Sequence, residues 1–363
     1  MPAPTPKSLA IRGVSLYNQT MTILRGNIVK KKICLIYTGG TIGMVKSEKG
    51  YVPSEDAFLQ LLSQLPELSN PAFPDYETIV FTPLLDSSDI AVEEWNKMGR
   101  TIASRYEACD GFVVLHGTDT MAYSASALSF MLENLEKPVI FTGSQIPLYE
   151  LRSDGRDNLI SAMLLAASEH IREVCIYFGG QLLRGNRATK LSSDGMHAFD
   201  SPNYPPLVKA GIDFKFRLPS DLPPSEGPFR FQPFEAMPLG VLKVFPGIQF
   251  DLFESIMTES LRGVVLESFG AGNVPSARTA LLPVLKKAHD HGTLVVVRSQ
   301  CPEGKVNLGS YAASLSLKEI GAVDGGDMTT EAALAKLYYL FSKGEKPEKV
   351  KALMEANLRG ERS

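Results

Sequence analysis

Short apolar segments that run into glycine recur through the first half of the chain and constrain its fold more than any other feature. Four such segments, rich in Val, Ile and Phe, lie at 32–37, 111–116, 138–141 and 174–178. Segments of this length and composition are typical of strands buried on both faces of a parallel sheet. Helical patterns at 122–135 and 157–167 lie between some of them. Strands that alternate with helices predict right-handed βαβ units around a mainly parallel sheet.

The sequence predicts an α/β fold made of two α/β domains, since 363 residues are enough for about two. The stretches 201–206 and 218–228 are rich in proline and poor in regular patterns, which is typical of a domain end followed by a linker. Strand patterns then resume at 240–245, 263–266 and 294–298. We therefore expect a larger N-terminal domain with a mainly parallel sheet, a linker and a smaller C-terminal domain, at 31–214, 215–236 and 237–363.

Residues 1–30 are predicted to form an N-terminal arm. They lack the continuous apolar core of a secretory signal. Because Met21 lies shortly before the first predicted strand, the arm is either flexible or the product of an upstream start codon. No segment of the chain approaches the ~20 apolar residues of a membrane span. These features predict a cytoplasmic protein that does not bind membranes.

The charge balance favours a small substrate, and the histidine and cysteine patterns offer no metal site. The 37 basic and 40 acidic residues give a formal net charge of -3, which offers no electrostatic reason to expect nucleic acid or an anionic membrane surface. His289 and His291 have poor spacing for zinc, and neither GxSxG nor HExxH occurs. We therefore predict no metal site. The cysteines are far apart, without a CxxC, and we interpret them as reduced thiols: Cys34, Cys109, Cys175 and Cys301.

Hydroxyl-bearing side chains follow two of the predicted strands. Thr41 lies in the glycine-rich loop 39–43, and Thr118 and Asp119 lie in the loop 116–120. Since the carboxyl ends of parallel strands open on one edge of a sheet, the two loops are expected to converge. The alternatives are an ordinary turn at Thr41 and an N-cap at Asp119 or Thr120 for the helix that follows.

Two further polar segments have a structural and a functional interpretation. Lys190 is either a solvated surface charge or the partner of Asp119. The loop 83–89 either places Asp89 as the N-cap of a helix at 93–103 or supplies hydroxyl and amide donors that hold a carboxylate.

The motifs YTGGTIG at 37–43 and GFVVLHGTDTMA at 111–122, in this order, resemble the asparaginase family. The segments 126–134 and 142–147 resemble its bacterial type I, cytoplasmic branch in particular, and the likeness covers the chain from about Lys31 onward. The resemblance implies hydrolysis of L-asparagine to L-aspartate and ammonia without a cofactor. It also implies a homodimer or homotetramer in which active sites lie between subunits.

The resemblance further assigns roles to individual residues. Thr41 would be the nucleophile that forms an acyl-enzyme, and Tyr51, on a closing loop, would orient or deprotonate it. Thr118, Asp119 and Lys190 would form a second triad that positions or activates the attacking species. The substrate contacts implied are Asp86, Ser87, Ser88, Thr118, Asp119 and Asn273, among which Asp119 binds the α-ammonium and Ser87 the α-carboxylate.

Some type I enzymes carry a second, regulatory asparagine site built from Cys, Thr and Arg. Cys301 and Thr189 match this pattern, but Glu267 stands at the position of the Arg. A carboxylate would repel the carboxylate of the ligand where a guanidinium would pair with it. We therefore expect allosteric activation to be weakened or absent.

Three other functions compete with the amidohydrolase. The amidase part of a tRNA-dependent amidotransferase shares these threonines, but an added N-terminal domain is expected there, whereas about 30 residues precede the first predicted strand here. A non-catalytic amino-acid sensor would not need the full set of side chains. A purely structural protein leaves the hydroxyl-rich loops without a role.

Overall fold

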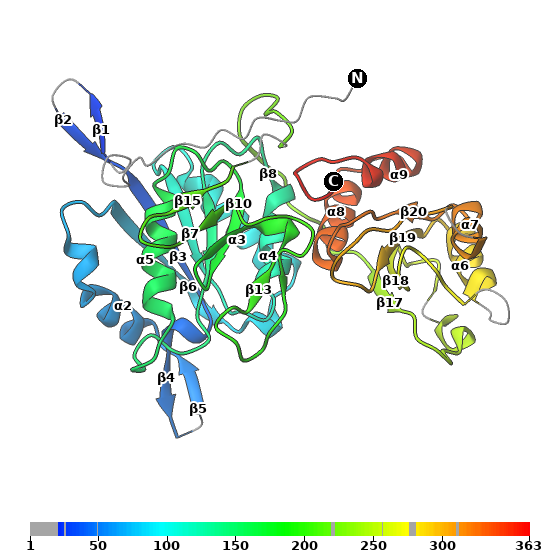
Figure 1. Ribbon diagram of the computed structural model, residues 1–363, viewed down its shortest axis with the longest axis horizontal. Helices are drawn as coiled ribbons and strands as arrows, with labels where there is room; N and C mark the ends of the chain where they lie inside the picture. Colours follow the sequence, from blue (N-terminus) through cyan, green and yellow to red (C-terminus); the bar gives the residue numbers. More distant parts are fainter. Residues whose placement is uncertain are drawn as a thin grey trace. The chain divides into compact units, whose positions relative to one another are not determined.

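The computed structural model describes residues 21–24, 27–48, 50–218, 222–255, 257–275, 281–309 and 312–363, so most of the predicted N-terminal arm lies outside the described residues. The chain divides after Phe231 into two compact units (Figure 1). Each unit contains a sheet of its own, the first large and mostly parallel, the second smaller. The prediction of two α/β domains is thereby confirmed.

The first unit is built on an eight-stranded sheet with the order β15-β14-β11-β10-β9-β7-β3-β6. The five strands from β10 to β6 pair in parallel, and β11, β14 and β15 extend the sheet in antiparallel fashion. The strand bounds are β3 (Lys32–Gly39), β6 (Asp75–Leu85), β7 (Gly111–Leu115), β9 (Val139–Thr142), β10 (Val174–Phe178), β11 (Gln181–Arg184), β14 (Val208–Lys209) and β15 (Lys215–Phe216).

Short two-stranded pairings complete the first unit. They join β1 (Met21–Leu24) to β2 (Asn27–Lys30), β4 (Met44–Ser47) to β5 (Gly50–Pro53), β12 (Thr189–Lys190) to β13 (Phe199–Asp200), and β8 (Leu132–Glu133) to β16 (Arg230–Phe231). Within the range expected as a linker, β15 and β16 therefore pair with strands of the first unit.

The helices of the first unit are α2 (Glu55–Ser63), α3 (Val92–Arg105), α4 (Met121–Met131) and α5 (Gly155–Ala166). The helix predicted at 122–135 ends early, and that prediction was wrong at its end because Leu132–Glu133 pairs with β16 instead of continuing the helix. Asp89 does not cap α3. The helix begins after Ala91, whose backbone N–H donates to Glu94 at 2.9 Å.

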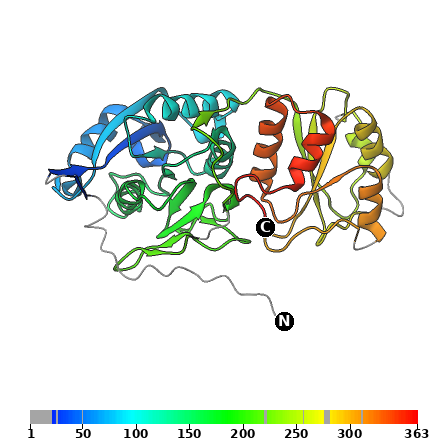
Figure 2. The same ribbon diagram turned by 90° about the horizontal axis from the view of Figure 1, so that it is seen from above.

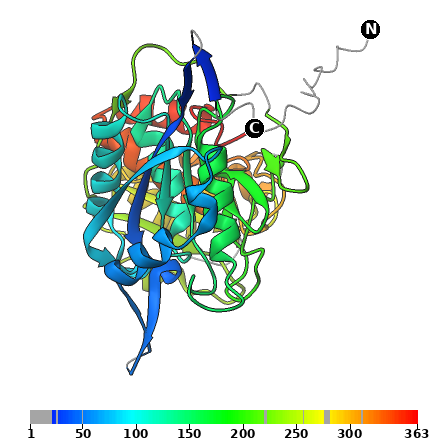
Figure 3. The same ribbon diagram turned by 90° about the vertical axis from the view of Figure 1, so that its left-hand side faces the viewer.

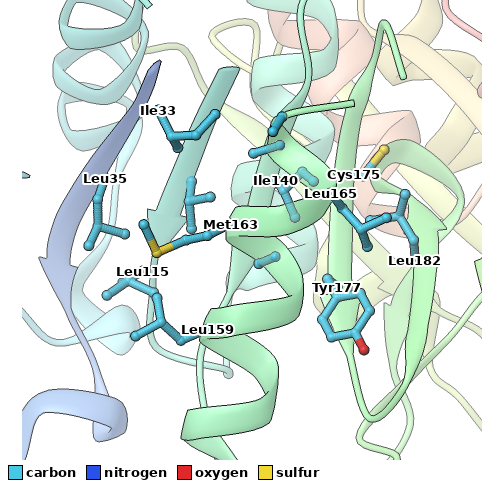
Figure 4. Close-up of a cluster of buried hydrophobic side chains, with 14 of the residues drawn as sticks. Ile33, Leu35, Leu115, Ile140, Leu159, Met163, Leu165, Cys175, Tyr177 and Leu182 are labelled. Carbon is cyan, nitrogen blue, oxygen red and sulfur yellow. The ribbon is translucent and has the colours of Figure 1, made fainter. Parts of the chain in front are cut away.

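Alternate residues of the central strands face opposite helices. Ile33 and Leu35 of β3 pack in one apolar cluster with Leu159 and Met163 of α5 (Figure 4). These four side chains are fully buried, and so is Cys34, which lies between the first two in sequence. Burial on both faces explains why these segments read as continuous apolar runs.

The second unit has a four-stranded parallel sheet with the order β17-β18-β19-β20. Figure 2 shows α8 and α9 on one side of this sheet and α6 and α7 on the other. None of the described helices is long and apolar enough to cross a membrane. The bounds are β17 (Leu239–Lys243), β18 (Gly263–Ser268), β19 (Leu294–Ser299), β20 (Val323–Asp324), α6 (Leu281–Asp290), α7 (Ala312–Glu319), α8 (Thr330–Ser342) and α9 (Pro347–Glu355).

Candidate active site

The loops that leave β3, β6 and β7 touch one another at the carboxyl edge of the large sheet. A methyl group on Gly40, which has a φ of 88°, would lie 2.5 Å from the backbone nitrogen of Gly117. A methyl group on Gly117 would lie 2.5 Å from Oγ of Ser87, and one on Gly39 would collide with the backbone of Leu85. Only glycine permits this close approach of three loops and the left-handed backbone at Gly40.

The two candidate threonines each follow one of these touching glycines. Thr41 begins a 3-10 turn, Thr41–Gly43, and is half-buried, whereas Thr118 is 8% exposed. Thr38, on the same strand as Gly39, donates to the carbonyl of Leu115 at 2.8 Å and ties the end of β3 to β7. Both hydroxyl groups therefore belong to loops that are fixed against each other.

Lys190 bridges Thr118 and Asp119. Its Nζ donates to Oγ1 of Thr118 at 2.8 Å and to Oδ1 of Asp119 at 2.7 Å. The Lys190 side chain is 18% exposed, so its interpretation as a solvated surface charge is wrong. The carboxylate of Asp119 is 67% exposed and open to a ligand while it holds the ammonium group.

Thr120 stands at the N-cap position of α4, but its side chain does not form the capping bond that was the alternative for this loop. Its Oγ1 donates instead to the carbonyl oxygen of Ser87 at 2.7 Å. The loops after β6 and β7 are thus joined by a hydrogen bond as well as by the contact at Gly117.

Gln145 completes the surroundings of Thr118 and was missed by the sequence analysis. Oγ1 of Thr118 lies 3.4 Å from Oε1 of Gln145, whose amide nitrogen donates to the carbonyl of Gly195 at 3.2 Å. Asp154 accepts the backbone N–H of Gln145 and fixes the loop. Gln145 follows a predicted strand, so the sheet-edge argument that singled out Thr118 would also have found it.

The loop after β6 places the three expected substrate contacts differently. Ser87 is buried, 5% exposed, beside Gly117. Asp86 and Ser88 are exposed, and Oδ1 of Asp86 accepts both the backbone N–H and the hydroxyl of Ser88 at 2.9 Å. Ser87 is therefore the member of this loop that faces the loop of Thr118.

Tyr51 lies on β5, in the hairpin that projects from the first unit (Figure 3). Its side chain is half exposed, and its hydroxyl donates to Oε1 of Glu150 at 3.0 Å. This hydrogen bond raises the pKa of Tyr51, because the carboxylate favours the protonated phenol. In this conformation the hydroxyl is held by Glu150.

His116 supports the site from within the core. It is completely buried, its Nε2 lies 2.8 Å from Oγ of Ser124, and its Nδ1 lies 2.6 Å from the carbonyl of Gly117. Burial lowers the pKa of His116 to about 4, so the ring is neutral at pH 7. Trp95 also donates to Oγ of Ser124, at 3.0 Å. The histidine is therefore a satisfied core residue.

Two family models match the chain and cover most of it. The model described as "Asparaginase, N-terminal" matches residues 32–221, and the "Glutaminase/Asparaginase C-terminal domain" matches residues 239–354.

This chain belongs to the asparaginase family.

Individual asparaginases are similar over nearly their whole length, and the resemblance inferred from the motifs is confirmed. L-asparaginase 1 of Escherichia coli (strain K12) is 48% identical, over 92% of this chain and 98% of the relative. The crystal structure of L-asparaginase I from Vibrio cholerae O1 biovar eltor superimposes with a TM-score of 0.84 at 44% identity, covering 92% of this chain and 100% of that one. The thermostable L-asparaginase from Thermococcus kodakarensis gives a TM-score of 0.83 at 32% identity, covering 92% and 99%.

In this asparaginase, the second unit holds three of the residues singled out from the sequence. Asn273 forms an antiparallel bridge with Phe269 through their backbones. Cys301 is exposed. The carboxylate of Glu267 accepts Nη1 of Arg298 at 3.3 Å and the hydroxyl of Thr330 at 2.5 Å. Glu267 is thus already paired with a guanidinium from its neighbouring strand, which the sequence analysis did not anticipate.

Thr189, the other residue expected in a regulatory site, belongs to the first unit. It lies in β12 and pairs with Asp200 of β13. It directly precedes Lys190, so this short strand also carries the ammonium group of the candidate active site.

Proposed function

We propose that this chain hydrolyses L-asparagine to L-aspartate and ammonia, with Thr41 as the nucleophile and an acyl-enzyme as the intermediate. The observation that carries the proposal is the bridge from Lys190 to both Thr118 and Asp119, on the loop that touches the loop of Thr41. The names of the similar proteins, L-asparaginase 1 and L-asparaginase I, support the choice of substrate.

The exposed carboxylate of Asp119 suits the α-ammonium group of asparagine, and the hydroxyl of Ser87 suits its α-carboxylate. A carboxylate and a hydroxyl donor on adjoining loops would fix the short substrate so that its side-chain amide faces Thr41. Positioning of this kind replaces a bimolecular encounter by a reaction within one complex.

In the first step, Oγ1 of Thr41 attacks the amide carbon, and Tyr51 would relay its proton after the hairpin closes: the phenol oxygen gains the threonine proton as its own proton passes toward the amide nitrogen. The tetrahedral intermediate collapses, and the amide nitrogen leaves as ammonia after gaining a proton. An ester between Thr41 and the β-carboxyl of aspartate remains. Closure of the hairpin also excludes bulk water from this step.

In the second step, water hydrolyses the ester. The ammonium group of Lys190 donates to Oγ1 of Thr118 and holds this hydroxyl in place beside the ester. Thr118 can then accept a hydrogen bond from the attacking water and direct it to the carbonyl carbon. Release of aspartate restores the hydroxyl of Thr41, and no cofactor enters either step.

The experiment is ammonia release from L-asparagine by the wild type and by Thr41→Ala. Loss of the nucleophile should lower kcat at least ~100-fold. Thr101→Ala is the matched control, because that hydroxyl donates to the carbonyl of Lys97 within α3 and is expected to leave the rate unchanged. Acid quenching followed by peptide mapping should find the aspartyl ester on Thr41. Equal rates, or an ester on another residue, would refute this role.

Asp119→Ala tests whether Asp119, which pairs with Lys190, also binds the substrate. The substrate ammonium would lose its anchor in the ground state, so KM should rise as well as kcat fall. An unchanged KM in this variant would show that Asp119 does not bind the substrate in the ground state.

The assembly and the location belong to the same proposal. We infer a cytoplasmic homodimer or homotetramer with active sites between subunits and with Asn273 at the edge of the site. The free cysteines support a reducing compartment. Light scattering during size exclusion gives the assembly state, and a fully active monomer would contradict the intersubunit site.

Activation by a second asparagine is proposed to be weak or absent. The carboxylate of Glu267 and the guanidinium of Arg298 already bind each other, so neither is offered to a ligand. The rate should therefore follow a hyperbola against asparagine concentration. A sigmoidal curve that became hyperbolic in Cys301→Ala would contradict this.

A further inference from the structure

Three metal-binding groups meet near the amino ends of the central strands. Sγ of Cys34 on β3, Sγ of Cys109 just before β7 and a carboxylate oxygen of Glu77 on β6 all lie within 4.8 Å of one another. Cys34 and Glu77 are directly paired across the two strands, so their side chains point to the same face of the sheet. The cysteines are at most 2% exposed, whereas the Glu77 side chain is 26% exposed.

The two oxygens of Glu77 have different surroundings. Oε2 accepts Nζ of Lys32 at 2.6 Å, and Oε1 accepts the thiol of Cys109 at 3.7 Å. Nε of Arg105 lies 3.3 Å from Oε1, on a side chain that is 48% exposed and able to move aside. Lys32 therefore anchors one oxygen and turns the other toward the sulfur atoms, as the outer partners of metal ligands do.

We propose that Cys34, Cys109 and Glu77 bind a zinc ion through Sγ, Sγ and Oε1. Two sulfur ligands and one oxygen ligand suit tetrahedral Zn²⁺, and water from the exposed side of Glu77 supplies the fourth position. Thiolates favour zinc over magnesium and calcium, which prefer oxygen.

Binding of Zn²⁺ releases two protons and leaves the net charge of the site unchanged. Each thiol releases one proton to solvent as its sulfur bonds to the ion. One dication thus replaces two protons, so the net charge beside Lys32, Glu77 and Arg105 stays the same. The buried site gains the ion without gaining net charge, which limits the cost of desolvation.

The site is separate from the proposed chemistry. Cys34 lies five residues before Gly39 on β3, which corresponds to about 16 Å along an extended strand. The ion would join β3, β6 and the turn between α3 and β7, and would stabilise the first unit. The sequence analysis did not predict this site, because the two cysteines are far apart in the chain and belong to no spaced motif.

The test uses the full chain, kept reduced with a phosphine and freed of metal with a chelator. Titration with cadmium chloride should produce the ultraviolet thiolate-to-metal absorption, saturating at one ion per chain, and zinc chloride should displace it. Cys34→Ala and Cys109→Ser should each weaken cadmium binding by at least ~10-fold. Loss of a residue that only hydrogen-bonds to a metal ligand already lowers affinity by this much, and these variants lose a ligand itself. Glu77→Gln should keep the absorption but weaken binding ~10-fold.

Cys175→Ser and Cys301→Ser are the controls and should bind cadmium like the wild type. The thiol of Cys175 is also buried but lies on β10, where it donates to the carbonyl of Glu173. Ammonia release shows whether each variant is folded, and it should not depend on the metal.

The rates at which individual cysteines of the wild type are alkylated provide a test without a variant. Zinc should slow the alkylation of Cys34 and Cys109 but not that of Cys301. The absence of a cadmium band in the wild type, or its persistence in Cys34→Ala and in Cys109→Ser, would overturn the proposal.

Discussion

The same three chemical groups occur at the carboxyl edges of both sheets, and they are arranged differently. In the first unit, Lys190 binds Thr118 and Asp119. In the second unit, a cation, a threonine hydroxyl and a carboxylate also meet, and the set is Arg298, Thr330 and Glu267.

The difference lies in what each cluster leaves available. In the second unit, Thr330 accepts a hydrogen bond from Arg298 and donates one to Glu267, and both charged side chains are only 14% exposed. The guanidinium, the hydroxyl and the carboxylate bind one another, while Nε of Arg298 is buried without a hydrogen-bond partner among the described residues, so the cluster joins α8 to the sheet. In the first unit, the carboxylate of Asp119 is 67% exposed and can accept a ligand. The comparison teaches that two clusters of the same composition can differ in access, since the first offers an exposed carboxylate to a ligand and the second does not.

The largest expected effect is that of Lys190→Met on turnover. Without the ammonium group, the hydroxyl of Thr118 loses its polarising donor and Asp119 loses its partner. We expect kcat to fall at least ~100-fold while the protein stays folded. Ammonia release and circular dichroism measure the two properties. A variant that retains wild-type turnover would show that the first cluster is as purely structural as the second.

His116 gives the next effect, on stability, because this buried ring lies beneath the first cluster. Its pKa of about 4 is below the ordinary 6.5, so the folded state binds fewer protons than the unfolded state between these values. The stabilisation from the neutral ring is complete above pH 6.5 and is lost as the pH falls toward 4, by about 3 kcal/mol.

Urea denaturation at several pH values checks this expectation. In His116→Gln, which keeps a donor and an acceptor but cannot be protonated, the free energy of unfolding should fall less steeply with acid. Identical pH dependence in the two proteins would mean that the ring titrates normally.

Arg298→Met tests the structural role of the second cluster. Glu267 would remain nearly buried without its guanidinium, at a cost of about 1–3 kcal/mol in the free energy of unfolding, and turnover should be unchanged. Lys287→Met is the matched control, since that lysine pairs with Glu254 at the surface and the expected loss is only ~0–1 kcal/mol. Equal losses in both variants would show that burial does not distinguish the two pairs.

Glu150→Gln gives the smallest effect. The variant keeps the shape of the residue but removes the charge that holds the hydroxyl of Tyr51. A hydrogen bond to a charged group at an exposed site contributes little, so release of this hydroxyl for the proposed closure of the hairpin should raise kcat/KM only a few-fold. Steady-state kinetics measures this. If turnover fell as much as in Lys190→Met, Glu150 would take part in the reaction itself.

Local patterns predicted the frame of the site. The segment 174–178 is a strand with the predicted bounds, and the loops of Thr41 and Thr118 follow predicted strands. Strand periodicity and glycine position are properties of a few neighbouring residues, so they can be read from the chain. The end of α4 was predicted incorrectly because β16, which ends that helix, lies almost a hundred residues further along.

The sequence by itself determined a parallel α/β architecture, the loops that open at the sheet edge and, through its motifs, the asparaginase family. Only the tertiary structure decided which polar side chains meet: Lys190 with Asp119, Arg298 with Glu267, Tyr51 with Glu150, and Cys34 with Cys109 and Glu77. The reason is physical. A buried strand is specified by its own apolar residues, whereas a hydrogen bond or an ion pair depends on a distance of about 3 Å between side chains that only the folded backbone brings together.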